Sequence, residues 1–244
     1  VGAPEIAGRW RSEQVWIGGG SLGPHQAMFV PPHHDRVAPA IADPVRFMGR
    51  DDLPVLPHVA VAHAQFETIH PFADGNGRTG RALVHAMLRN KALTRNVTVP
   101  VSAGLLADTE RYFDALRAYR GGDPSAIVAQ FSAASFAAIN NGRRLVTELR
   151  VIRAAWADRV SARSDAKVWL VADLLLAHPV INATLVASEL EVHLPNVYRQ
   201  IEPLVAAGVL TEFTDQKRNR AWRSPEVLTA LDDFATRAGR RSRS

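Results

Sequence analysis

A Gly-Asn-Gly turn at residues 75–77 separates two helical patterns, and this break constrains the fold more than any other feature of the sequence. After the turn, residues 78–90 are apolar on most sides, which is typical of a buried helix. Before it, apolar residues recur at the spacings of three and four that mark one helix face: Val55, Val59, Ala62, Phe66 and Ile69. The sequence therefore predicts a mainly α fold with a loop of special conformation between two helices.

The composition is that of a globular protein with a hydrophobic core. The chain has 244 residues, of which 47% are hydrophobic and 22% are charged. It contains no cysteine, which excludes disulfides and thiolate metal sites. No apolar run approaches the length of a membrane span, and the N-terminus lacks the pattern of a secretory signal. We therefore expect a cytoplasmic protein without a membrane partner. Because the sequence does not begin with Met, we also expect natural residues before Val1.

The formal net charge of +5 arises entirely near the C-terminus. Residues 1–216 contain 21 basic and 21 acidic residues, whereas residues 217–244 contain 8 basic and 3 acidic residues. A basic segment can attract an acidic partner such as nucleic acid. We interpret the final "RAGRRSRS" itself as a solvated tail.

The first part of the chain is expected to form a short N-terminal segment and a helical core. In residues 1–52, two extended runs flank a Gly-rich connection, which is the pattern of a β-hairpin. Residues 53–160 form the helical core, with Asp52 as the cap of its first helix. Residues 140–142, Asn-Asn-Gly, are expected to break or kink the last long helix, and the polar residues 161–167 are the expected linker.

Capping residues delimit two further helices in this core. Asp108 or Thr109 caps a helix that ends at Gly121. Asp123 and Pro124 then have the types expected at the cap and the first position of the next helix.

Residues 168–236 have the pattern of a winged helix-turn-helix, followed by a basic tail at 237–244. Helices at about 166–177 and 184–190 precede a third helix that Gly208 ends, and two strands joined by a polar tip follow. Residues early in the third helix and at the tip are suited to contact DNA: Asn196, Tyr198, Arg199, Lys217, Arg218 and Arg220. The alternative is a module for dimerisation or target docking. Three glutamates that weaken the positive field support it: Glu189, Glu191 and Glu202.

The loop "HPFADGNGRTGR", residues 70–81, combines a base, a carboxylate, a flexible turn and two permanent cations. His70 can accept a proton near neutral pH, and Phe72 is expected to anchor the loop by turning its ring into the core. Asp74 offers the hard oxygen ligand that Mg²⁺ prefers beside substrate phosphates.

The residues after Asp74 are suited to hold a polyphosphate. The Gly-Asn-Gly turn can direct backbone N–H groups at an anion, and the positive end of the next helix begins there. Arg78 and Arg81 lie one helical turn apart, and their guanidiniums match phosphate oxygens. The pattern predicts a phosphoryl or nucleotidyl transfer site that works by positioning and charge neutralisation.

The loop resembles the Fic-family signature His-x-Phe-x-Asp/Glu-Gly-Asn-Gly-Arg-x-x-Arg. It matches all eight specified positions, which are His70, Phe72, Asp74, Gly75, Asn76, Gly77, Arg78 and Arg81. The runs "WIG" at 16–18 and "FVPP" at 29–32 look like the family's flap hairpin, and the helices up to about residue 150 resemble its core. A C-terminal winged helix is also familiar in one large group of Fic proteins.

The resemblance implies transfer of AMP from ATP to a Ser, Thr or Tyr hydroxyl of a protein, with release of pyrophosphate. His70 would deprotonate the hydroxyl, and Asp74 would hold Mg²⁺ between the α- and β-phosphates. Arg78 would lie on the β/γ side and Arg81 would clamp the γ-phosphate. The anion hole would comprise Gly75, Asn76 and Gly77. The protein substrate would align along the flap by β-strand addition.

Two further features refine the resemblance. Doc-type relatives, which phosphorylate their targets, carry Lys where this chain has Gly77, so Gly77 favours adenylylation. Many Fic proteins carry an inhibitory helix with the pattern Ser/Thr-x-x-x-Glu-Gly/Asn, but none of the ten glutamates here is followed by Gly or Asn. That element is expected upstream of Val1, on another chain, or not at all, and the first of these is favoured.

Other candidate residues and functions remain open. The adenine base needs an apolar slot, for which Tyr112 and Tyr119 are weak candidates. Incomplete ligand spacing argues against metal sites at residues 33–35 (His-His-Asp) and at the pair His58 and His63. The functional alternatives are a DNA-binding regulator whose Fic domain senses nucleotide, and an enzyme that transfers another nucleotide. A homodimer is a further candidate assembly.

Overall fold

The structure, a computed structural model, describes residues 8–19, 24–94, 101, 104–105, 108–214 and 220–238. The chain divides into two compact units, Val1–Ile139 and Asn140–Ser244, and the boundary falls inside helix α6 (Ser125–Arg159). Among the described helices, none combines the length and the apolar character needed to cross a membrane.

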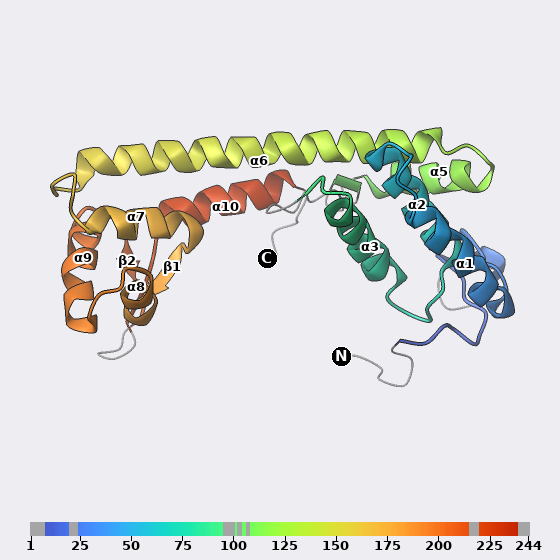
Figure 1. Cartoon of the computed structure of the whole chain (residues 1–244), viewed down its shortest axis with the longest axis horizontal. Coiled ribbons are helices and arrows are strands. Elements are labelled where there is room, and N and C mark those ends of the chain that lie inside the picture. Colours follow the sequence, from blue (N-terminus) through green and yellow to red (C-terminus); the bar gives the residue numbers. More distant parts are fainter. Residues whose placement is uncertain are drawn as a thin grey trace. The chain divides into compact units, whose positions relative to one another are not determined.

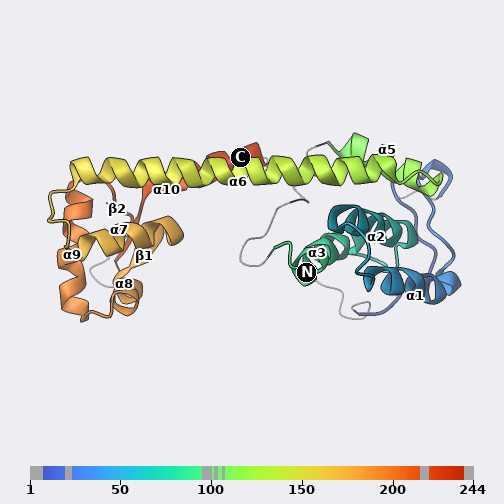
Figure 2. The ribbon, with the colours of Figure 1, turned by 45° about the horizontal axis from the view of Figure 1, so that its top comes forward.

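The first unit is built almost entirely from helices. In chain order they are the 3₁₀ turns η1 (Pro24–Gln26) and η2 (His34–Arg36), and the helices α1 (Val37–Met48), α2 (Val55–Ile69), α3 (Asn76–Asn90), α5 (Thr109–Arg120) and the beginning of α6. Helix α2 packs against α1, α3 and α5, and Figure 2 shows α1, α2 and α3 side by side. The core of this unit joins α2 to the start of α6 through fully buried residues such as Val59, Ile127 and Phe131.

Helix α1 lies in a segment where the sequence was expected to form no helix. It contains Pro39 and Pro44, and prolines usually mark the end of a helix. Pro39 is tolerated because it occupies the first turn, where backbone N–H groups have no partner within the helix. Pro44 is buried, so its ring adds to the packing. Helix α2 also begins later than expected: Pro54 precedes it, and the expected cap Asp52 instead pairs with Arg50.

The expected β-hairpin is represented by one antiparallel bridge between Ile17 and Phe29. The Ile17 N–H donates to the Phe29 carbonyl at 2.9 Å, and the Met28 N–H donates to the Ile17 carbonyl at 2.8 Å. Gly19 has a φ of +80°, and a Cβ there would lie 2.2 Å from the Gln26 carbonyl oxygen, so only glycine permits this close return of the chain. The described residues of the segment form no longer strands, and the connection at 20–23 lies outside them.

The capping predictions for the later helices agree with the structure. Asp108 caps α5 and accepts from the Arg111 N–H at 3.0 Å, and Gly121 follows the last residue of the helix. Asp123 accepts from the Ser125 N–H at 2.8 Å, where α6 begins.

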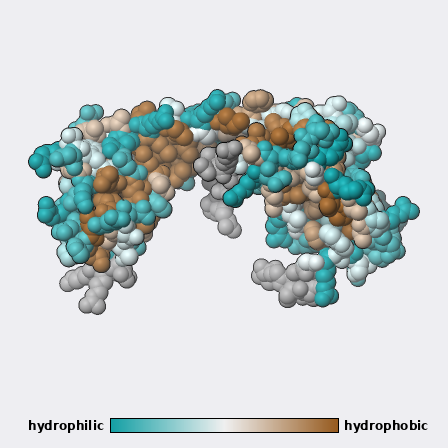
Figure 3. Space-filling model, in the orientation of Figure 1, coloured by the Kyte–Doolittle hydropathy of each residue, from teal (hydrophilic) through white to brown (hydrophobic). Residues whose placement is uncertain are grey.

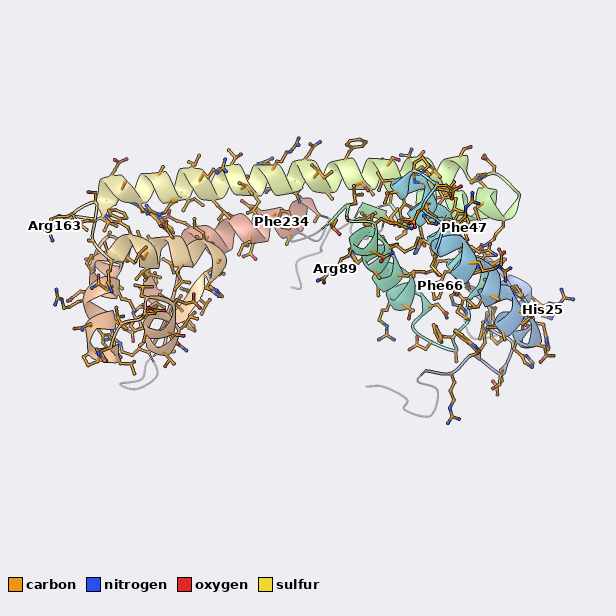
Figure 4. All side chains as sticks on the ribbon, in the orientation of Figure 1. His25, Phe47, Phe66, Arg89, Arg163 and Phe234 are labelled. Atoms are coloured by element: carbon orange, nitrogen blue, oxygen red, sulfur yellow. The ribbon has the colours of Figure 1, made fainter. Side chains whose placement is uncertain are left out.

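The expected break at residues 140–142 is wrong, because α6 continues through it without interruption. The side chain of Asn141 explains why this polar residue is tolerated in a long helix. Its amide donates to the Phe234 carbonyl at 3.1 Å, and its oxygen accepts from Arg237 at 2.7 Å. Both partners belong to the second unit's last helix, on which Figure 4 labels Phe234.

The second unit combines helices with a small antiparallel sheet (Figure 1). After α6 come α7 (Val168–Ala177), β1 (Val180–Asn182), α8 (Ala183–Glu189), α9 (Leu194–Ala206), β2 (Thr211–Glu212), β3 (Ala221–Arg223) and α10 (Pro225–Arg237). The strands lie in the order β1-β3-β2, with Trp222 of β3 opposite Ile181 and Glu212. Three helices and two strands were predicted, whereas β1 and α10 were not. The expected linker at 161–167 lies within this unit, between α6 and α7.

A core of large apolar residues holds the second unit together. Trp156 of α6 and Trp222 of β3 are both at most 1% exposed and belong to the same cluster as Val171, Ile201 and Val227. In Figure 3, hydrophobic residues gather over the part of this unit where α6, α7 and α10 lie. The polar tip between β2 and β3, including Lys217 and Arg218, lies outside the described residues, as does the tail from residue 239.

Candidate active site

A cavity of about 230 Å³ in the first unit connects the motif loop with an apolar wall. Three of the predicted site residues line it: His70, Gly77 and Arg81. The remaining lining comes from the N-terminal segment, from α2 and from the region of α5: Ile17, His63, Glu67, Leu105, Tyr112, Phe113, Leu116 and Arg120. The lining thus combines titratable groups with apolar side chains, which is the usual character of a ligand site.

The loop places His70 by a sharp turn at the end of α2. His70 adopts the left-handed conformation with φ 50° and ψ 62°, which is uncommon for a residue other than glycine. Its backbone N–H donates to the Phe66 carbonyl at 2.9 Å, so the turn closes the helix while the imidazole enters the cavity wall. Such a conformation persists only where surrounding contacts hold it.

Arg11 supplies those contacts. The side chain is 5% exposed, and its guanidinium donates to the carbonyls of His70 at 2.9 Å and Ile69 at 3.5 Å. The Arg11 backbone N–H donates to the Pro71 carbonyl at 2.9 Å. The guanidinium also reaches the carbonyls of Glu13 and Pro32, which precede and follow the Ile17–Phe29 bridge. One buried arginine therefore ties the N-terminal segment to the turn that carries His70.

Phe72 and Asn76 hold the other half of the loop. The Asn76 side chain is buried and forms two hydrogen bonds with the backbone of Phe72. Its oxygen accepts from the Phe72 N–H at 2.9 Å, and its NH₂ group donates to the Phe72 carbonyl at 2.7 Å. The Phe72 ring lies 5.2 Å from that of Trp10 and 6.3 Å from that of Phe66, which Figure 4 labels. Phe72 is only partly buried, so it anchors the loop at the edge of the core rather than inside it.

The turn after the loop forms the start of α3. Gly75 is its cap and has a φ of +83°. The helix begins at Asn76, so the backbone N–H groups of its first turn have no intrahelical acceptor and carry the positive end of the helix dipole. A Cβ on Gly77 would lie 3.3 Å from Nη1 of Arg81, so glycine leaves the first turn and this guanidinium open to the cavity. The geometry is that of an anion site.

Asp74 and Arg78 lie at the exposed side of the loop and do not line the cavity. Their side chains pair at 3.0 Å and are 75% and 73% exposed, respectively. Such an exposed pair contributes at most about 1 kcal/mol, so a ligand can separate its partners at small cost. The second Asp74 oxygen accepts from the Gly75 N–H at 2.6 Å, which fixes the carboxylate beside the turn. A single carboxylate next to an anion site suits Mg²⁺ that arrives bound to phosphates.

His70 is poised to accept a proton. Burial is the main cause that lowers the pKa of His70, and the backbone carbonyl of Glu67 opposes this effect. The positive charges of Arg11 and Arg120 lower the pKa further. A lowered pKa keeps the imidazole neutral at physiological pH, which is the form a general base requires.

Two charged residues that line the cavity, Glu67 and Arg120, were not predicted from the sequence. Glu67 is 7% exposed, and burial raises its pKa to about 7 although Arg81 and Arg120 act in the opposite direction. The Arg120 guanidinium lies 3.4 Å above the Phe29 ring, and burial lowers its pKa. Glu67 could have been noticed as an acidic residue beside the apolar stripe of α2, whereas Arg120 gives no such signal at the end of an ordinary amphipathic helix.

Two of the histidines considered for metal binding, His58 and His63, have other partners. His63 Nε2 lies 2.8 Å from the Tyr112 hydroxyl, and burial lowers the pKa of His63 to about 4, so this ring is neutral. His58 Nε2 lies 2.7 Å from the Phe47 carbonyl. Possible ligand atoms of residues 33–35 come within 4.8 Å of one another, and the Asp35 carboxylate contacts both imidazoles at 3.2 and 3.3 Å.

The two candidate adenine contacts differ in position. Tyr112 lines the cavity with its ring while its hydroxyl is held by His63. Tyr119 donates to Gln65 at 2.9 Å and does not line the cavity. Only Tyr112 is therefore placed to contact a ligand there.

Residues 2–88 match the model of the Fic/DOC family, and this range includes the N-terminal segment, α2, the motif loop and nearly all of α3. The chain carries a Fic/DOC family domain. The match ends before α5, so the family model does not extend to Tyr112 and Arg120 on the far wall of the cavity.

Curated relatives of the Fic domain are named protein adenylyltransferases. The fic-1 proteins of Caenorhabditis briggsae and Caenorhabditis elegans are each 31% identical over 88 residues, which are 35% of this chain and 16% of the relative. A probable protein adenylyltransferase of Aquifex aeolicus is 44% identical over 57 residues, 23% of this chain and 15% of the relative. This chain thus covers at most 16% of the length of these relatives. A crystal structure of a Fic family protein from Desulfovibrio desulfuricans G20 has a TM-score of 0.47 and 23% identity, covering 88% of this chain and 62% of that one.

Proposed function

We propose that the Fic domain transfers AMP from ATP to a hydroxyl group of a protein. One observation carries the proposal: a neutral, partly buried imidazole lines the same cavity as the first turn of α3 and a guanidinium from that helix. A base and an anion site that share one cavity suit attack of an alcohol on a phosphate. The names of the curated relatives support adenylylation as the reaction.

In the proposed reaction, the substrate hydroxyl gives its proton to His70 as its oxygen forms a bond to the α-phosphorus. The bond between the α-phosphorus and the bridging oxygen breaks, and pyrophosphate leaves. The N–H groups of Asn76 and Gly77 would hold the phosphate oxygens, and the Gly75 N–H would join them by exchanging its present acceptor, Asp74 Oδ1, for a phosphate oxygen. Arg81 would bind the terminal phosphate. These donors are fixed before the substrate arrives, because Asn76 and Arg11 hold the loop from both sides.

Asp74 and Arg78 would act on the exposed side of the triphosphate. Mg²⁺, when bound with the nucleotide, would neutralise part of the phosphate charge, and Asp74 would hold it. Arg78 would exchange its present partner Asp74 for a phosphate oxygen. The apolar wall, with Tyr112 and Phe113, would receive the base, and the backbone near Ile17 would align an extended target segment.

Labelling with α-³²P-ATP and Mg²⁺ tests the proposal. The protein is incubated with a cell lysate, and self- and target-labelling are compared with those of His70→Ala. Exposed His178, in the second unit, gives the matched control His178→Ala. We expect His70→Ala to abolish labelling and His178→Ala to retain it. Labelling that does not depend on His70 would reject the mechanism.

We also propose that the second unit is a winged helix, since its elements and its β1-β3-β2 sheet follow the order of that fold. Asn196, Tyr198 and Arg199 are exposed on α9, the helix that would enter the major groove. Arg220, in contrast, forms two bonds to Glu212 at 2.7 and 2.5 Å, which reduces its availability for phosphate. These observations leave DNA binding as the second candidate function.

Anisotropy of a fluorescent duplex tests the second candidate. A DNA-binding unit would show affinity that falls steeply with salt and that Arg199→Ala weakens. Absence of salt-dependent binding would leave docking or dimerisation as the role of this unit. Binding of DNA together with failure of His70-dependent labelling would favour a regulator whose Fic domain senses nucleotide.

A further inference from the structure

Three buried side-chain atoms of residues that line the cavity lack a hydrogen-bond partner among the described residues. They are Nδ1 of His70, Oε1 of Glu67 and Nε of Arg120. The other carboxylate oxygen of Glu67, Oε2, lies 3.8 Å from Nδ1 of His70. Both side chains line the cavity, three residues apart at the end of α2. Buried groups of this kind are normally paired, so this juxtaposition requires an explanation.

We propose that Glu67 is a positioning residue for His70, whose carboxylate accepts a hydrogen bond from Nδ1–H and stabilises the imidazolium formed when Nε2 takes the substrate proton. The proposal rests on the proposed function and extends it by one residue that the signature leaves unspecified. With the Nδ1 proton held by Glu67, Nε2 is the free acceptor that a general base needs. The same logic of base and orienting carboxylate operates in other hydroxyl-activating enzymes.

The charges around His70 explain why a carboxylate is needed. Arg11 and Arg120 both place positive charge near the imidazole, and burial also opposes its protonation. These effects favour the neutral form of His70, so formation of the imidazolium during the reaction costs free energy. Among the described residues, Glu67 is the only acidic side chain within ion-pair distance of His70. Ionised Glu67 offsets the two guanidiniums at the step that creates the positive charge.

The groups that face Glu67 permit its ionisation. Arg81 from α3 and Arg120 from α5 favour the charged carboxylate, while burial opposes it. His63 of α2 is neutral, and Tyr112 of α5 bonds to His63. Glu67 itself forms no ion pair with either arginine at a distance of 4.0 Å or less in the described part of the chain. Burial outweighs the two arginines, so the pKa of Glu67 is about 7 and the ionised carboxylate that pairs with the imidazole becomes the main form above that pH.

Gly80 of α3 makes the space that Glu67 occupies. A Cβ at this position would lie 2.5 Å from Oε1 of Glu67, closer than any tolerated contact. The Nδ1–Oε2 separation must shorten by about 1 Å to reach a charge-assisted hydrogen bond. Catalytic hydrogen bonds are often long before the substrate binds, so the present distance fits a pair that tightens during the reaction.

NMR of ¹⁵N-histidine in the resting full-length protein tests the pairing without any assumption about the reaction. In the wild type we expect the Nδ1-protonated tautomer of His70. Glu67→Leu should abolish this preference. Glu67→Gln, which keeps an acceptor but loses the charge, should lower the pKa of His70 and partly retain the tautomer. Exposed Glu189 gives the control Glu189→Gln with the same charge change.

Labelling rates test the catalytic consequence. We expect Glu67→Gln to reduce kcat about 10- to 100-fold with KM for ATP changed less than about threefold, and Glu67→Leu to reduce kcat more. Gly80→Ala should act in the same direction by displacing the carboxylate, whereas Gly142→Ala, with open space at its Cβ, should have no effect. Circular dichroism of each variant serves as the control for correct folding.

Two results would overturn the proposal. If the tautomer and pKa of His70 are unchanged in Glu67→Leu, the backbone carbonyl of Glu67 holds Nδ1 and the carboxylate does not. If the NMR changes occur but kcat stays within about twofold of wild type, Glu67 does not assist the base. Absence of transfer activity in the wild type would reject the proposed function, and the NMR measurement would still decide the pairing.

Discussion

The motif loop of the first unit and the core of the second unit are held by different kinds of contact. Directed hydrogen bonds from buried Arg11 and Asn76 fix the loop. Apolar packing of Trp156 and Trp222 fixes the second unit. Apolar packing stabilises without specifying direction, whereas each hydrogen bond places one atom. A loop that must aim an imidazole and several N–H groups therefore depends on polar contacts that a core does not need.

Removal of one aromatic residue should give the largest loss of stability. Trp222 is 1% exposed in the second unit's core, so Trp222→Ala should cost about 3–5 kcal/mol in the free energy of unfolding of that unit. Exposed Trp10 gives the control Trp10→Ala. Urea titration followed by circular dichroism measures the change. A loss below about 1 kcal/mol would contradict the assignment of apolar packing as the main stabilising contact there.

Replacement of the buried arginine should affect both stability and activity. Arg11→Ala leaves the carbonyls of His70 and Pro32 without their present partner and should cost about 2–4 kcal/mol. The position of His70 should be lost, so labelling should fall at least tenfold. Exposed Arg9 provides the control Arg9→Ala.

The variant Arg11→Lys sharpens this prediction. Lysine keeps the positive charge but not the planar fork that reaches several carbonyls. Stability and labelling closer to Arg11→Ala than to wild type would show that the directed bonds matter. Stability and labelling equal to those of the wild type would show that the positive charge alone holds the loop.

The buried carboxylate should make stability depend on pH. Because the pKa of Glu67 is raised from 4.5 to about 7, the folded protein binds a proton that the unfolded chain has already lost between these values. The free energy of unfolding therefore decreases as pH rises from 4.5 to 7, because Glu67 must release its proton in the folded state. Glu67→Gln should remove this decrease, so that its free energy of unfolding exceeds that of the wild type by about 2–3 kcal/mol at the upper end of this range. His63 acts oppositely below pH 6.5, so the comparison must be made between the two proteins at each pH.

The smallest effect should come from an exposed ion pair of the second unit. Arg159 and Glu226 pair at 2.6 Å but are 40% and 34% exposed. Arg159→Ala should cost less than about 1 kcal/mol, and less still in 1 M salt. Glu226→Ala should cost more, because Glu226 also accepts from buried Trp156 at 3.1 Å. Equal effects of the two substitutions would contradict this ranking.

The sequence predicted the elements that local patterns determine. The helices around the Gly-Asn-Gly turn, the cap at Asp108 and the three helices after residue 168 agree with the structure. Helix α1 was missed although residues 37, 41, 44 and 48 follow helical spacing, because residues 1–52 were interpreted as two extended runs around a Gly-rich connection. The break expected at 140–142 was wrong because distant partners on α10 satisfy Asn141.

The candidate site was predicted only where one continuous segment supplies it. His70, Gly77 and Arg81 meet at the cavity as the loop pattern implies, and Tyr112 lines it as well. Arg11 and Arg120 come from segments 59 and 50 residues away from His70 in the chain, so their contribution appears only after folding. Glu67 lies close in sequence, but its significance depends on burial beneath Gly80.

The exposed contact between Asp74 and Arg78 has a consequence for which molecules can dock. A bare anion that approaches Arg78 is repelled by the neighbouring carboxylate, and a bare divalent cation that approaches Asp74 is repelled by the guanidinium. A cation and an anion that arrive together satisfy both side chains at once. In the proposed reaction, the Asp74–Arg78 pair would therefore favour a cation and an anion that arrive as a preassembled neutralised pair.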